Sequence, residues 1–505
     1  MNIELDLVKT IEYALKQLPE ESMQEVGTVV KIVDNVASVY GLSNALYNEL
    51  VNFSSGNIGI VLSLDEYFAS VVIFHSGKNG VIEGEAVART KQVLKIGVGE
   101  KQLGRVVDAL GNPCDSLGEI EFEDFVPAEK SAPSIMDRSP INEPLQSGIL
   151  AIDSLVPIGK GQRELILGDR GTGKTSIVLD TIIAQKNRGV ICVYVSIGNK
   201  QSSTAKIINT LELNGAMGYT IVVQADAYAS ALSQFFAPYT GCAIGEFFMS
   251  KGKDVLIVYD DLSNHAVAYR ELSLLLRRAP GREAYPGDIF YIHSRLLERA
   301  CKLSKAKGGG SLTALPVAQT QGDDISAYIP TNLISITDGQ IILNSSLFNR
   351  GIRPAINIGA SVSRVGGNAQ TKAMKKVCSS LKLDLAQYEE LVAFSQFGSE
   401  LDKKSKLALD RGARAIELLK QPKLEVYSFV DQTMFLLLLK EGIFDMIGIE
   451  LVQIFAIKYA SFVQAIYPEL YKSIETSKDL TEQVAQSLIE IAHEFSLLFS
   501  KEQTE

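Results

Sequence analysis

The sequence predicts a multidomain protein: a small N-terminal β-barrel, a central α/β domain and a C-terminal α-helical bundle. A length of 505 residues suggests about three domains, and the hydrophobic pattern changes its period twice along the sequence. Hydrophobic residues make up 46% and charged residues 21%, as is typical of globular proteins that can bury a core. We place the boundaries at residues 1–22 for an N-terminal helix, 23–94 for the barrel, 95–372 for the α/β domain and 373–505 for the helical domain.

The N-terminal part changes from a helical to a strand pattern. A short amphipathic helix is expected over residues 3–18, where apolar side chains recur at helical spacing: Ile3, Leu7, Ile11, Leu15 and Leu18. From Val26 to about Arg89 the sequence has short stretches rich in Val and Ile, separated by Gly, Asn and Asp. This pattern indicates a small all-β domain, and the alternative is one sheet that belongs to a larger domain.

The central part alternates strand-like and helix-like segments, which predicts a mostly parallel sheet. The candidate strands are residues 165–167, 190–197, 221–224, 255–259 and 333–343. After Ala373 the strand pattern ends and helical spacing takes over in two sets: Leu381, Leu385, Tyr388 and Val392, then Val484, Leu488, Ile491, Phe495 and Leu498.

Composition excludes several classes of function. The formal net charge is −10, which argues against a protein that coats nucleic acid. Five widely spaced cysteines without a C-x-x-C pair and four scattered histidines argue against disulfide or metal frameworks. No signal peptide is expected, and charged residues interrupt the most apolar region, residues 434–467, before it reaches the ~20 apolar residues of a membrane helix. Any membrane link is therefore expected to pass through a partner.

The most specific motif is GDRGTGKT at residues 168–175, which fits the phosphate-loop pattern G-x-x-x-x-G-K-[ST]. A strand-like ELIL precedes it and a helix-like TSIVLDTIIAQK follows, so bound phosphates would lie at a helix N-terminus. The predicted nucleotide-binding residues are Gly168, Asp169, Arg170, Gly171, Thr172, Gly173, Lys174 and Thr175. The central domain is therefore expected to be a P-loop α/β nucleotide-binding domain; the alternative is a glycine-rich turn.

A second motif, VLIVYDD, ends a predicted buried strand in Asp260 and Asp261. P-loop proteins hold Mg²⁺ with the hydroxyl of the loop and with a carboxylate at such a strand end. We expect Thr175 to bind Mg²⁺ directly and Asp260 to bind it through water, with Mg-ATP or Mg-ADP as the ligand. Asp261 is a candidate cap of the next helix.

Several long motifs together resemble one family. They are GDRGTGKT, residues 259–300, residues 325–343, SVSRVGGNAQTKAM at 361–374, GRVVDALGNP at 104–113 and residues 383–402. The protein is similar to the alpha subunit of rotary F-type ATP synthases from about Val26 to Gln421, as a somewhat divergent member.

The resemblance implies an assembly. Alternating alpha and beta subunits, three of each, would surround a central shaft, with a peripheral stalk or equivalent and an ion-translocating membrane sector. The complex would couple ATP synthesis or hydrolysis to shaft rotation and proton or other ion transport. It would lie peripherally on the cytoplasmic face of the membrane in a bacterium, attached only through partner subunits and without nucleic acid. The alpha-type site binds Mg-ATP without turning it over.

The resemblance also implies roles for single residues. Arg364 matches the arginine that alpha lends in trans to the catalytic site of the adjacent beta subunit, and Ser361 matches a position needed for activity. Three residues match the family's adenine pocket: Arg353, Pro354 and Gln421. Residues 279–288 match a loop that faces the shaft.

Other residues depart from the family or bear on catalysis. Beta-type sites carry a glutamate base after the strand that follows the P-loop, whereas this protein has Asn199, and a neutral amide cannot accept a proton near pH 7. Gly171 stands where most alpha subunits have Gln, Gln319 replaces a usual Glu, and Lys423 replaces a second Gln near the adenine. The effect of these departures on nucleotide affinity is not predicted by the sequence.

Three alternative functions fit parts of the sequence. One is a subunit of a specialised ATP-driven machine derived from the same ring of alternating alpha and beta subunits. Another is a hexameric nucleic-acid motor with a similar core, against which the acidic charge and Asn199 argue. The last is a structural protein with a vestigial site, against which intact Lys174, Thr175 and Asp260 argue. Neither the direction of operation nor the coupling ion follows from the sequence.

Overall fold

The computed structural model describes residues 25–74, 80–395 and 402–502, so the helix predicted at residues 3–18 lies outside the described part. The protein divides into two compact units. One contains the N-terminal strands up to Leu94 together with Glu271–Ala279, and the other contains Lys95–Arg270 and Pro280–Glu505.

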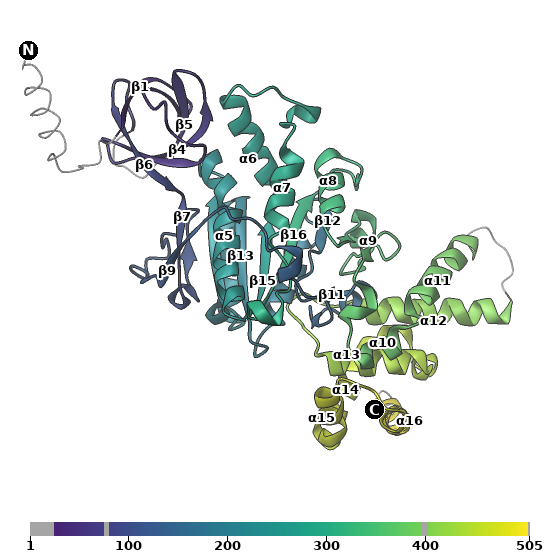
Figure 1. Cartoon of the computed structure of the whole chain (residues 1–505). Helices are drawn as coiled ribbons and strands as arrows, with labels where there is room; N and C mark the ends of the chain where they lie inside the picture. Colours follow the sequence, from purple (N-terminus) through teal and green to yellow (C-terminus); the bar gives the residue numbers. More distant parts are fainter. Residues whose placement is uncertain (1–24, 75–79, 396–401, 503–505) are drawn as a thin grey trace, which may run out of the picture. The chain divides into compact units, whose positions relative to one another are not determined.

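The first unit is built around a closed β-barrel with the strand order β1-β2-β5-β4-β3-β6 (Figure 1). Its strands are β1 (Val26–Val33), β2 (Val36–Tyr40), β3 (Glu49–Phe53), β4 (Ile58–Leu64), β5 (Phe68–Phe74) and β6 (Ala86–Val93). Alternate side chains point inward and form a small core that includes Val29, Val39, Val51 and Val71. The predicted β-barrel is confirmed, and closure leaves its strands without a free edge.

An eight-stranded sheet forms the centre of the second unit, in the order β18-β17-β12-β16-β15-β13-β14-β8. The strands are β8 (Val106–Val107), β12 (Leu165–Gly168), β13 (Val190–Asn199), β14 (Thr220–Asp226), β15 (Asp254–Asp260), β16 (Ser311–Gln319), β17 (Gly339–Ile342) and β18 (Val362–Ser363). All neighbouring pairs are parallel except β17 with β18. Two small sheets pair β7 (Lys95–Val98) with β9 (Asp124–Pro127) and β10 (Pro144–Leu145) with β11 (Ile158–Gly159).

Helices follow these strands, as the alternating pattern predicts. They are α2 (Leu150–Leu155), α3 (Lys174–Ile183), α4 (Gln201–Leu213), α5 (Ala231–Ser250), α6 (Leu262–Leu275), α7 (Ile289–Leu297), α8 (Tyr328–Ile336) and α9 (Ser345–Asn349). The strand predicted over residues 333–343 is wrong in its first half, which belongs to α8. Ile329, Leu333 and Ile336 are buried at helical spacing there, and only β17 is a strand.

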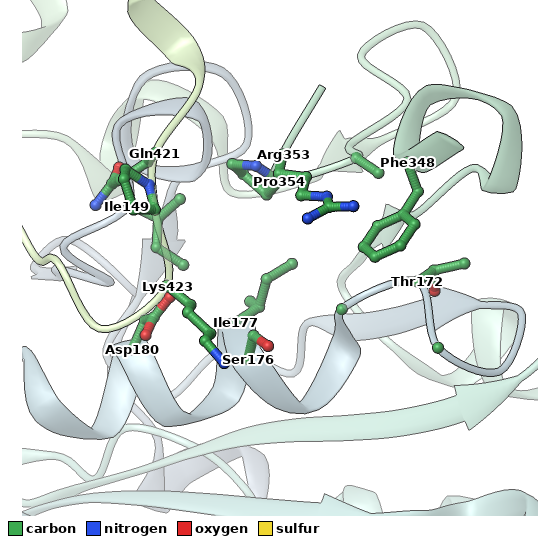
Figure 2. A pocket seen from close by; sticks show the side chains of 14 residues that line it. Ile149, Thr172, Ser176, Ile177, Asp180, Phe348, Arg353, Pro354, Gln421 and Lys423 are labelled. Atoms are coloured by element: carbon green, nitrogen blue, oxygen red, sulfur yellow. The ribbon is translucent and has the colours of Figure 1, made fainter. Parts of the chain in front are cut away.

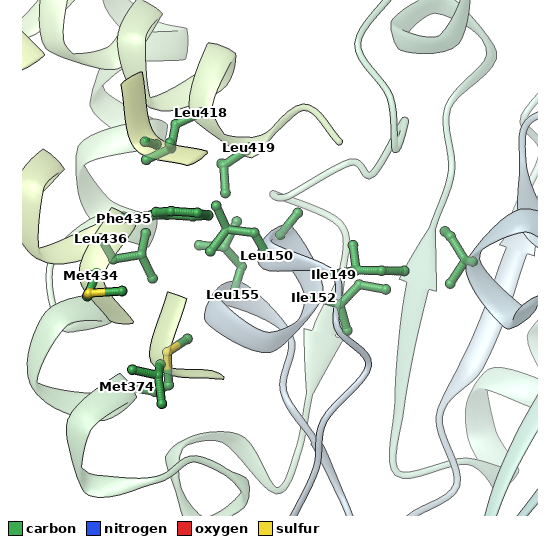
Figure 3. Packing of buried hydrophobic residues seen from close by; sticks show 14 of the residues in the cluster. Ile149, Leu150, Ile152, Leu155, Met374, Leu418, Leu419, Met434, Phe435 and Leu436 are labelled. Atoms are coloured by element: carbon green, nitrogen blue, oxygen red, sulfur yellow. The ribbon is translucent and has the colours of Figure 1, made fainter. Parts of the chain in front are cut away.

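The C-terminal helices are α10 (Lys372–Cys378), α11 (Leu381–Ser395), α12 (Lys403–Leu419), α13 (Phe429–Lys440), α14 (Val452–Ile466), α15 (Pro468–Ser477) and α16 (Glu482–Glu502). They share one hydrophobic cluster with the central domain, in which Phe435 and Leu418 lie near Leu150 of α2 (Figure 3). The helical repeat predicted over residues 484–498 is confirmed as α16, although Leu498 is 51% exposed and the next residue, Phe499, is buried.

Among the described residues, one stretch, Ile449–Ile466, is long and apolar enough by composition to cross a membrane. It covers α14, whose Phe455, Tyr459 and Val463 are buried in the same cluster. Core helices of soluble proteins can be equally long and apolar, so this stretch is weak evidence for a membrane span. The three-part fold class expected from the sequence, with its β-barrel, α/β and helical parts, is confirmed.

Candidate nucleotide-binding site

The phosphate loop follows β12 and leads into α3, while Asp260 ends β15 in the same sheet. Because both strands are parallel, their carboxyl ends lie at one edge of the sheet, where α/β proteins bind ligands. Gly171 and Gly173 have φ angles of +85° and +103°, in the left-handed region that glycine adopts without strain. The loop can therefore turn its backbone N–H groups toward a phosphate at the N-terminus of α3.

Lys174 is buried and its ammonium donates to two carbonyl oxygens of the loop. The Nζ–O distances are 2.7 Å to Gly168 and 2.7 Å to Asp169. Burial lowers the pKa of Lys174, while Asp261 and Asp260 oppose this effect. The ammonium is thus held within the loop, where a β- or γ-phosphate would exchange for the carbonyl oxygens.

The other loop residues support its shape. Asp169 accepts hydrogen bonds from Thr320 Oγ1 (2.7 Å) and from the backbone N–H of Asp323 (3.0 Å), so its carboxylate ties the loop to the end of β16. Thr172 Oγ1 donates to the Asp169 carbonyl at 2.8 Å. Arg170 is exposed, outside this network.

The donor set beside the loop fits a hydrated magnesium ion. Thr175 Oγ1 and the hydroxyl of Tyr194 donate to Asp260 Oδ2, at 3.1 Å and 2.8 Å respectively. Burial raises the pKa of Asp260, and the two hydroxyl hydrogen bonds and Lys174 counteract the rise. A hydroxyl next to a carboxylate offers the hard oxygen ligands that Mg²⁺ prefers. Tyr194 was not among the residues singled out from the sequence.

Asp261 acts as the expected helix cap. Its Oδ1 accepts from the backbone N–H of Asn264 at 2.7 Å, at the start of α6. Its Oδ2 accepts from the side-chain amide of Gln319. Burial, followed by the charge of Asp260, raises the pKa of Asp261 to about 6. This carboxylate is therefore engaged in structure rather than presented to a ligand.

Asn199 is the last residue of β13 and lies beside Asp260, the carboxylate predicted to bind Mg²⁺ through water. Its Nδ2 donates to the backbone carbonyl of Asp260 at 2.7 Å. The residue at the expected position of a catalytic base is thus a hydrogen-bond donor that fixes the strand end.

A cavity of about 470 Å³ continues from the loop toward the C-terminal helices (Figure 2). Arg353 and Pro354 lie on one wall, where the Arg353 guanidinium lies 4.3 Å from the ring centroid of Phe348. The remaining lining residues are Ile149, Gly171, Thr172, Gly173, Ser176, Ile177, Asp180, Ala355, Gln421, Pro422 and Lys423. The structure therefore brings all three predicted adenine-pocket residues into one cavity with the phosphate loop.

Gln421 contributes to the wall rather than offering a free amide. Its Oε1 accepts from the backbone N–H of Leu150 (3.0 Å), and its Nε2 donates to the carbonyls of Gly148 (2.8 Å) and Glu425. Besides Arg353, the charged residues that line the cavity are Lys423 and Asp180. Burial raises the pKa of Asp180 to about 6, and its Oδ1 accepts from the backbone N–H of Leu424 at 2.8 Å.

Sequence reasoning missed Asp180, Ser176 and Phe348 in this cavity. Asp180 lies four residues after Ser176 on α3, and this helical spacing is the signal that places both on the face that lines the cavity. Phe348 carries no motif, and only the fold brings it under Arg353.

Arg364 and Ser361 lie elsewhere. Arg364 directly follows β18 and is exposed, and its Nη2 donates to the Ile334 carbonyl at 3.3 Å. Ser361 is fully buried and its Oγ accepts from the backbone N–H of Ile342 at 3.0 Å, which fixes the start of β18 against β17. Neither residue lines the cavity.

The expectation that the histidines are scattered is wrong for two of them. His265 on α6 and His293 on α7 are fully buried, with Nδ1 and Nε2 3.1 Å apart, and His265 Nε2 lies 3.1 Å from the Phe235 carbonyl. Adjacent helices bring them together across 28 positions of sequence. The five cysteines have free thiols, and no group of three or more potential metal ligands occurs within residues 25–74, 80–395 and 402–502.

Fold and site together define a P-loop nucleotide-binding protein with a β-barrel and a helical domain. Three family models match. They are the nucleotide-binding domain of the ATP synthase alpha/beta family at residues 148–363, the C-terminal domain of the same subunits at 370–495 and their beta-barrel domain at 22–91.

Curated relatives match nearly the whole sequence. ATP synthase subunit alpha of Caldanaerobacter subterraneus subsp. tengcongensis is 55% identical over 465 residues, 92% of each protein. ATP synthase subunit alpha of Helicobacter pylori strain G27 is 51% identical over 497 residues, 98% of this protein and 99% of the relative. The protein belongs to the family of F-type ATP synthase alpha subunits.

Proposed function

We propose that the protein is a non-catalytic alpha subunit that binds Mg-ATP or Mg-ADP at its own phosphate loop and lends Arg364 to the catalytic site of an adjacent beta subunit. Alpha and beta subunits alternate, three of each, around a central shaft, supported by a peripheral stalk. The complex couples ATP synthesis or hydrolysis to rotation and to proton or other ion transport. It lies on the cytoplasmic face of a bacterial membrane, to which partner subunits attach it.

The position of Arg364 carries this proposal. Strand β12 runs parallel to β17 with Leu165 opposite Gln340, and β18 pairs with β17 so that Ser363 lies opposite Gly339. Arg364 therefore lies level with the amino end of β12, whereas the phosphate loop follows its carboxyl end. A strand of four residues separates these levels by about 13 Å. Arg364 is accordingly placed away from its own loop, on the exposed segment that follows β18, which suits a neighbouring subunit.

The composition of the subunit's own site supports binding without turnover. Asn199 stands where a base is needed and donates a hydrogen bond, and Asp169 and Asp261 are occupied by structural hydrogen bonds. A base contributes about 10²–10⁴ in rate, so its absence leaves a site that holds nucleotide. Lys174, Thr175 and Asp260 supply what binding requires: a phosphate partner, a hydroxyl and a carboxylate.

The planar fork of an arginine suits the charge that spreads over a transferring γ-phosphate, and such an arginine contributes about 10³–10⁵ in rate. We therefore expect Arg364→Ala to lower multisite ATP hydrolysis by the reconstituted complex at least 100-fold, with assembly intact by native mass spectrometry. Arg364→Lys restores little, because lysine keeps the charge and loses the fork.

Lys174→Ala is the matched variant in the same assay. It removes nucleotide from the subunit's own site and leaves the beta site and Arg364 in place, so the loss of turnover is much smaller than in Arg364→Ala. Near-normal turnover in a fully assembled Arg364→Ala complex would mean that another residue supplies this charge. Robust hydrolysis by the isolated subunit, abolished by Lys174→Ala, would overturn the non-catalytic assignment.

A further inference from the structure

Glu164 lies immediately before β12, at the same end of the sheet as Arg364. Its side chain is fully buried, and its backbone N–H donates to the Ala314 carbonyl at 2.9 Å. The parallel register places Glu164 level with Gly339, which is itself opposite Ser363. A Cβ atom on Gly339 would lie 2.4 Å from Glu164 Oε2, so only glycine at the start of β17 leaves room for the carboxyl group.

One amide joins this carboxyl group to β18, which Arg364 directly follows. Gln162 Nε2 donates to Glu164 Oε2 at 2.7 Å and to Ser363 Oγ at 3.1 Å. Ser363 Oγ donates in turn to the Pro157 carbonyl at 2.7 Å. Because Ser363 directly precedes Arg364, a shift of the carboxyl group reaches the backbone of the arginine through two hydrogen bonds.

The charges around Glu164 are unevenly paired. Its Oε1 is buried without a hydrogen-bond partner, whereas the neighbouring Asp338 is engaged by a fork from Arg163, with Nε and Nη2 at 2.9 Å and 2.7 Å. Arg163 also pairs with Glu298. Burial raises the pKa of Glu164 well above its usual range, Asp338 adds to the rise, and Arg364 opposes it.

Arg364 is the complementary group on this side of the sheet. Its side-chain hydrogen bond uses Nη2, and within the described residues the other guanidinium N–H groups have no acceptor. A buried carboxyl oxygen without a donor costs folding free energy, and such features are retained where they serve a function. The buried carboxyl group and the exposed guanidinium are thus linked through Gln162 and Ser363.

We propose that Glu164 is a positioning residue for Arg364: its buried carboxyl group, held by Gln162, fixes Ser363 and thereby directs the guanidinium that follows it toward the neighbouring site, at a cost in folding stability. This inference rests on the proposed role of Arg364. It predicts opposite effects of one substitution on stability and on turnover, which a purely structural carboxyl group would not produce.

The test is Glu164→Gln in the reconstituted complex, because glutamine keeps the size and replaces the carboxyl group with an amide. We expect kcat for ATP hydrolysis to fall about tenfold with KM unchanged within about twofold, since misplacement of a catalytic group acts on the transition state. The melting temperature of the free subunit should be unchanged or higher. In an Arg364→Ala background, Glu164→Gln should cause no further loss, because the two residues act as one unit.

Asp153→Asn is the control for loss of a buried carboxyl group. Both Asp153 oxygens accept hydrogen bonds, from Ser147, Gly148 and Gln432, so this change should lower stability and leave kcat per assembled complex intact. Ser363→Ala removes the hydroxyl that accepts from Gln162 and so breaks the link between Glu164 and Arg364 at its other end. We expect it to lower kcat as well. It replaces Glu164→Gln as the test if that variant does not fold.

Three results overturn the inference alone. The first is wild-type kcat in assembled Glu164→Gln and Ser363→Ala complexes while Arg364→Ala is slow. The second is a Glu164→Gln loss that adds fully to that of Arg364→Ala. A lower melting temperature with unchanged kcat also overturns it, since that describes a structural carboxyl group. Normal turnover in Arg364→Ala overturns the inference together with the proposed function.

Discussion

The two ends of the central sheet differ in how many of their polar side-chain atoms have hydrogen-bond partners. At the carboxyl end, Lys174, Thr175 and Asp260 all have hydrogen-bond partners within the protein. At the amino end, Glu164 Oε1 has no partner, and Arg364 is exposed with a single side-chain hydrogen bond among the described residues. Under the proposed function, the internally paired groups form the subunit's own site, and the unpaired groups are those that would serve a neighbour.

Nucleotide binding by the isolated subunit tests this separation most strongly. Lys174→Ala should weaken Mg-ATP binding about 10- to 100-fold, because a charged hydrogen bond to phosphate contributes about 1.5–3 kcal/mol. Arg364→Ala should leave the affinity unchanged within about twofold. Isothermal titration calorimetry measures both, and equal losses in the two variants would place Arg364 in the subunit's own site.

The histidine pair, His265 and His293, is a buried polar region that does not line the nucleotide cavity and can be compared with it. Burial lowers the pKa of His265 to about 4, below the ordinary value of 6.5, so the unfolded protein takes up a proton first as pH falls. The stability of the neutral pair is fully present above about pH 6.5 and is lost as pH falls toward 4. We expect His265 to account for a loss of about 2 kcal/mol between about pH 7 and about pH 5.

Urea denaturation of the full-length protein at both pH values measures this slope. His265→Gln should flatten it, because glutamine keeps polar contacts and does not titrate. The exposed His493 is the control, and His493→Gln should leave the slope as in the wild type. The same slope in His265→Gln as in the wild type would assign the acid sensitivity to other groups.

The metal side of the site predicts a smaller, conditional effect. Asp260→Ala should weaken Mg-ATP binding about tenfold and ATP binding in excess chelator by less than about twofold, because the carboxylate acts on the ion through water. Calorimetry with and without Mg²⁺ separates the two conditions. Equal weakening in both would show that Asp260 only supports Thr175 and Tyr194.

The smallest effect concerns the flexibility of the loop. Gly171 and Gly118 both have a φ angle of +85° and open space where a Cβ would lie. Alanine at either position should lower the free energy of unfolding by about 1 kcal/mol, since a side chain in this region is strained. Only Gly171→Ala should also weaken nucleotide binding, by less than about tenfold in calorimetry. If Gly118→Ala weakens it as much, the loss arises from global destabilisation.

The accuracy of the sequence-based predictions follows the distance in sequence between interacting residues. The phosphate loop lies between β12 and α3 as predicted, because glycines, lysine and threonine act within one short run, residues 168–175. The assignment of residues 333–336 to a strand is wrong, because a short apolar run fits helix and strand equally well until a neighbour buries one face.

The candidate site shows the same division. The resemblance places Arg353, Pro354 and Gln421 in an adenine pocket, and all three line the cavity. The side-chain amide of Gln421, however, is hydrogen-bonded to the backbone of Gly148, Leu150 and Glu425. Gly148 and Leu150 lie 273 and 271 positions away in sequence. No local pattern reports such a contact.

The sequence by itself determined the barrel, the α/β alternation, the helical end, the phosphate loop and Asn199 in place of a base, because each depends on local period or on residue type. Only the tertiary structure decided which polar groups remain unpaired. Parallel strands place Arg364 and Glu164 at the end of the sheet opposite Lys174, and packed helices join His265 to His293. Pairing depends on where distant segments meet in space, and hydrogen bonds and burial act over a few ångströms regardless of separation along the sequence.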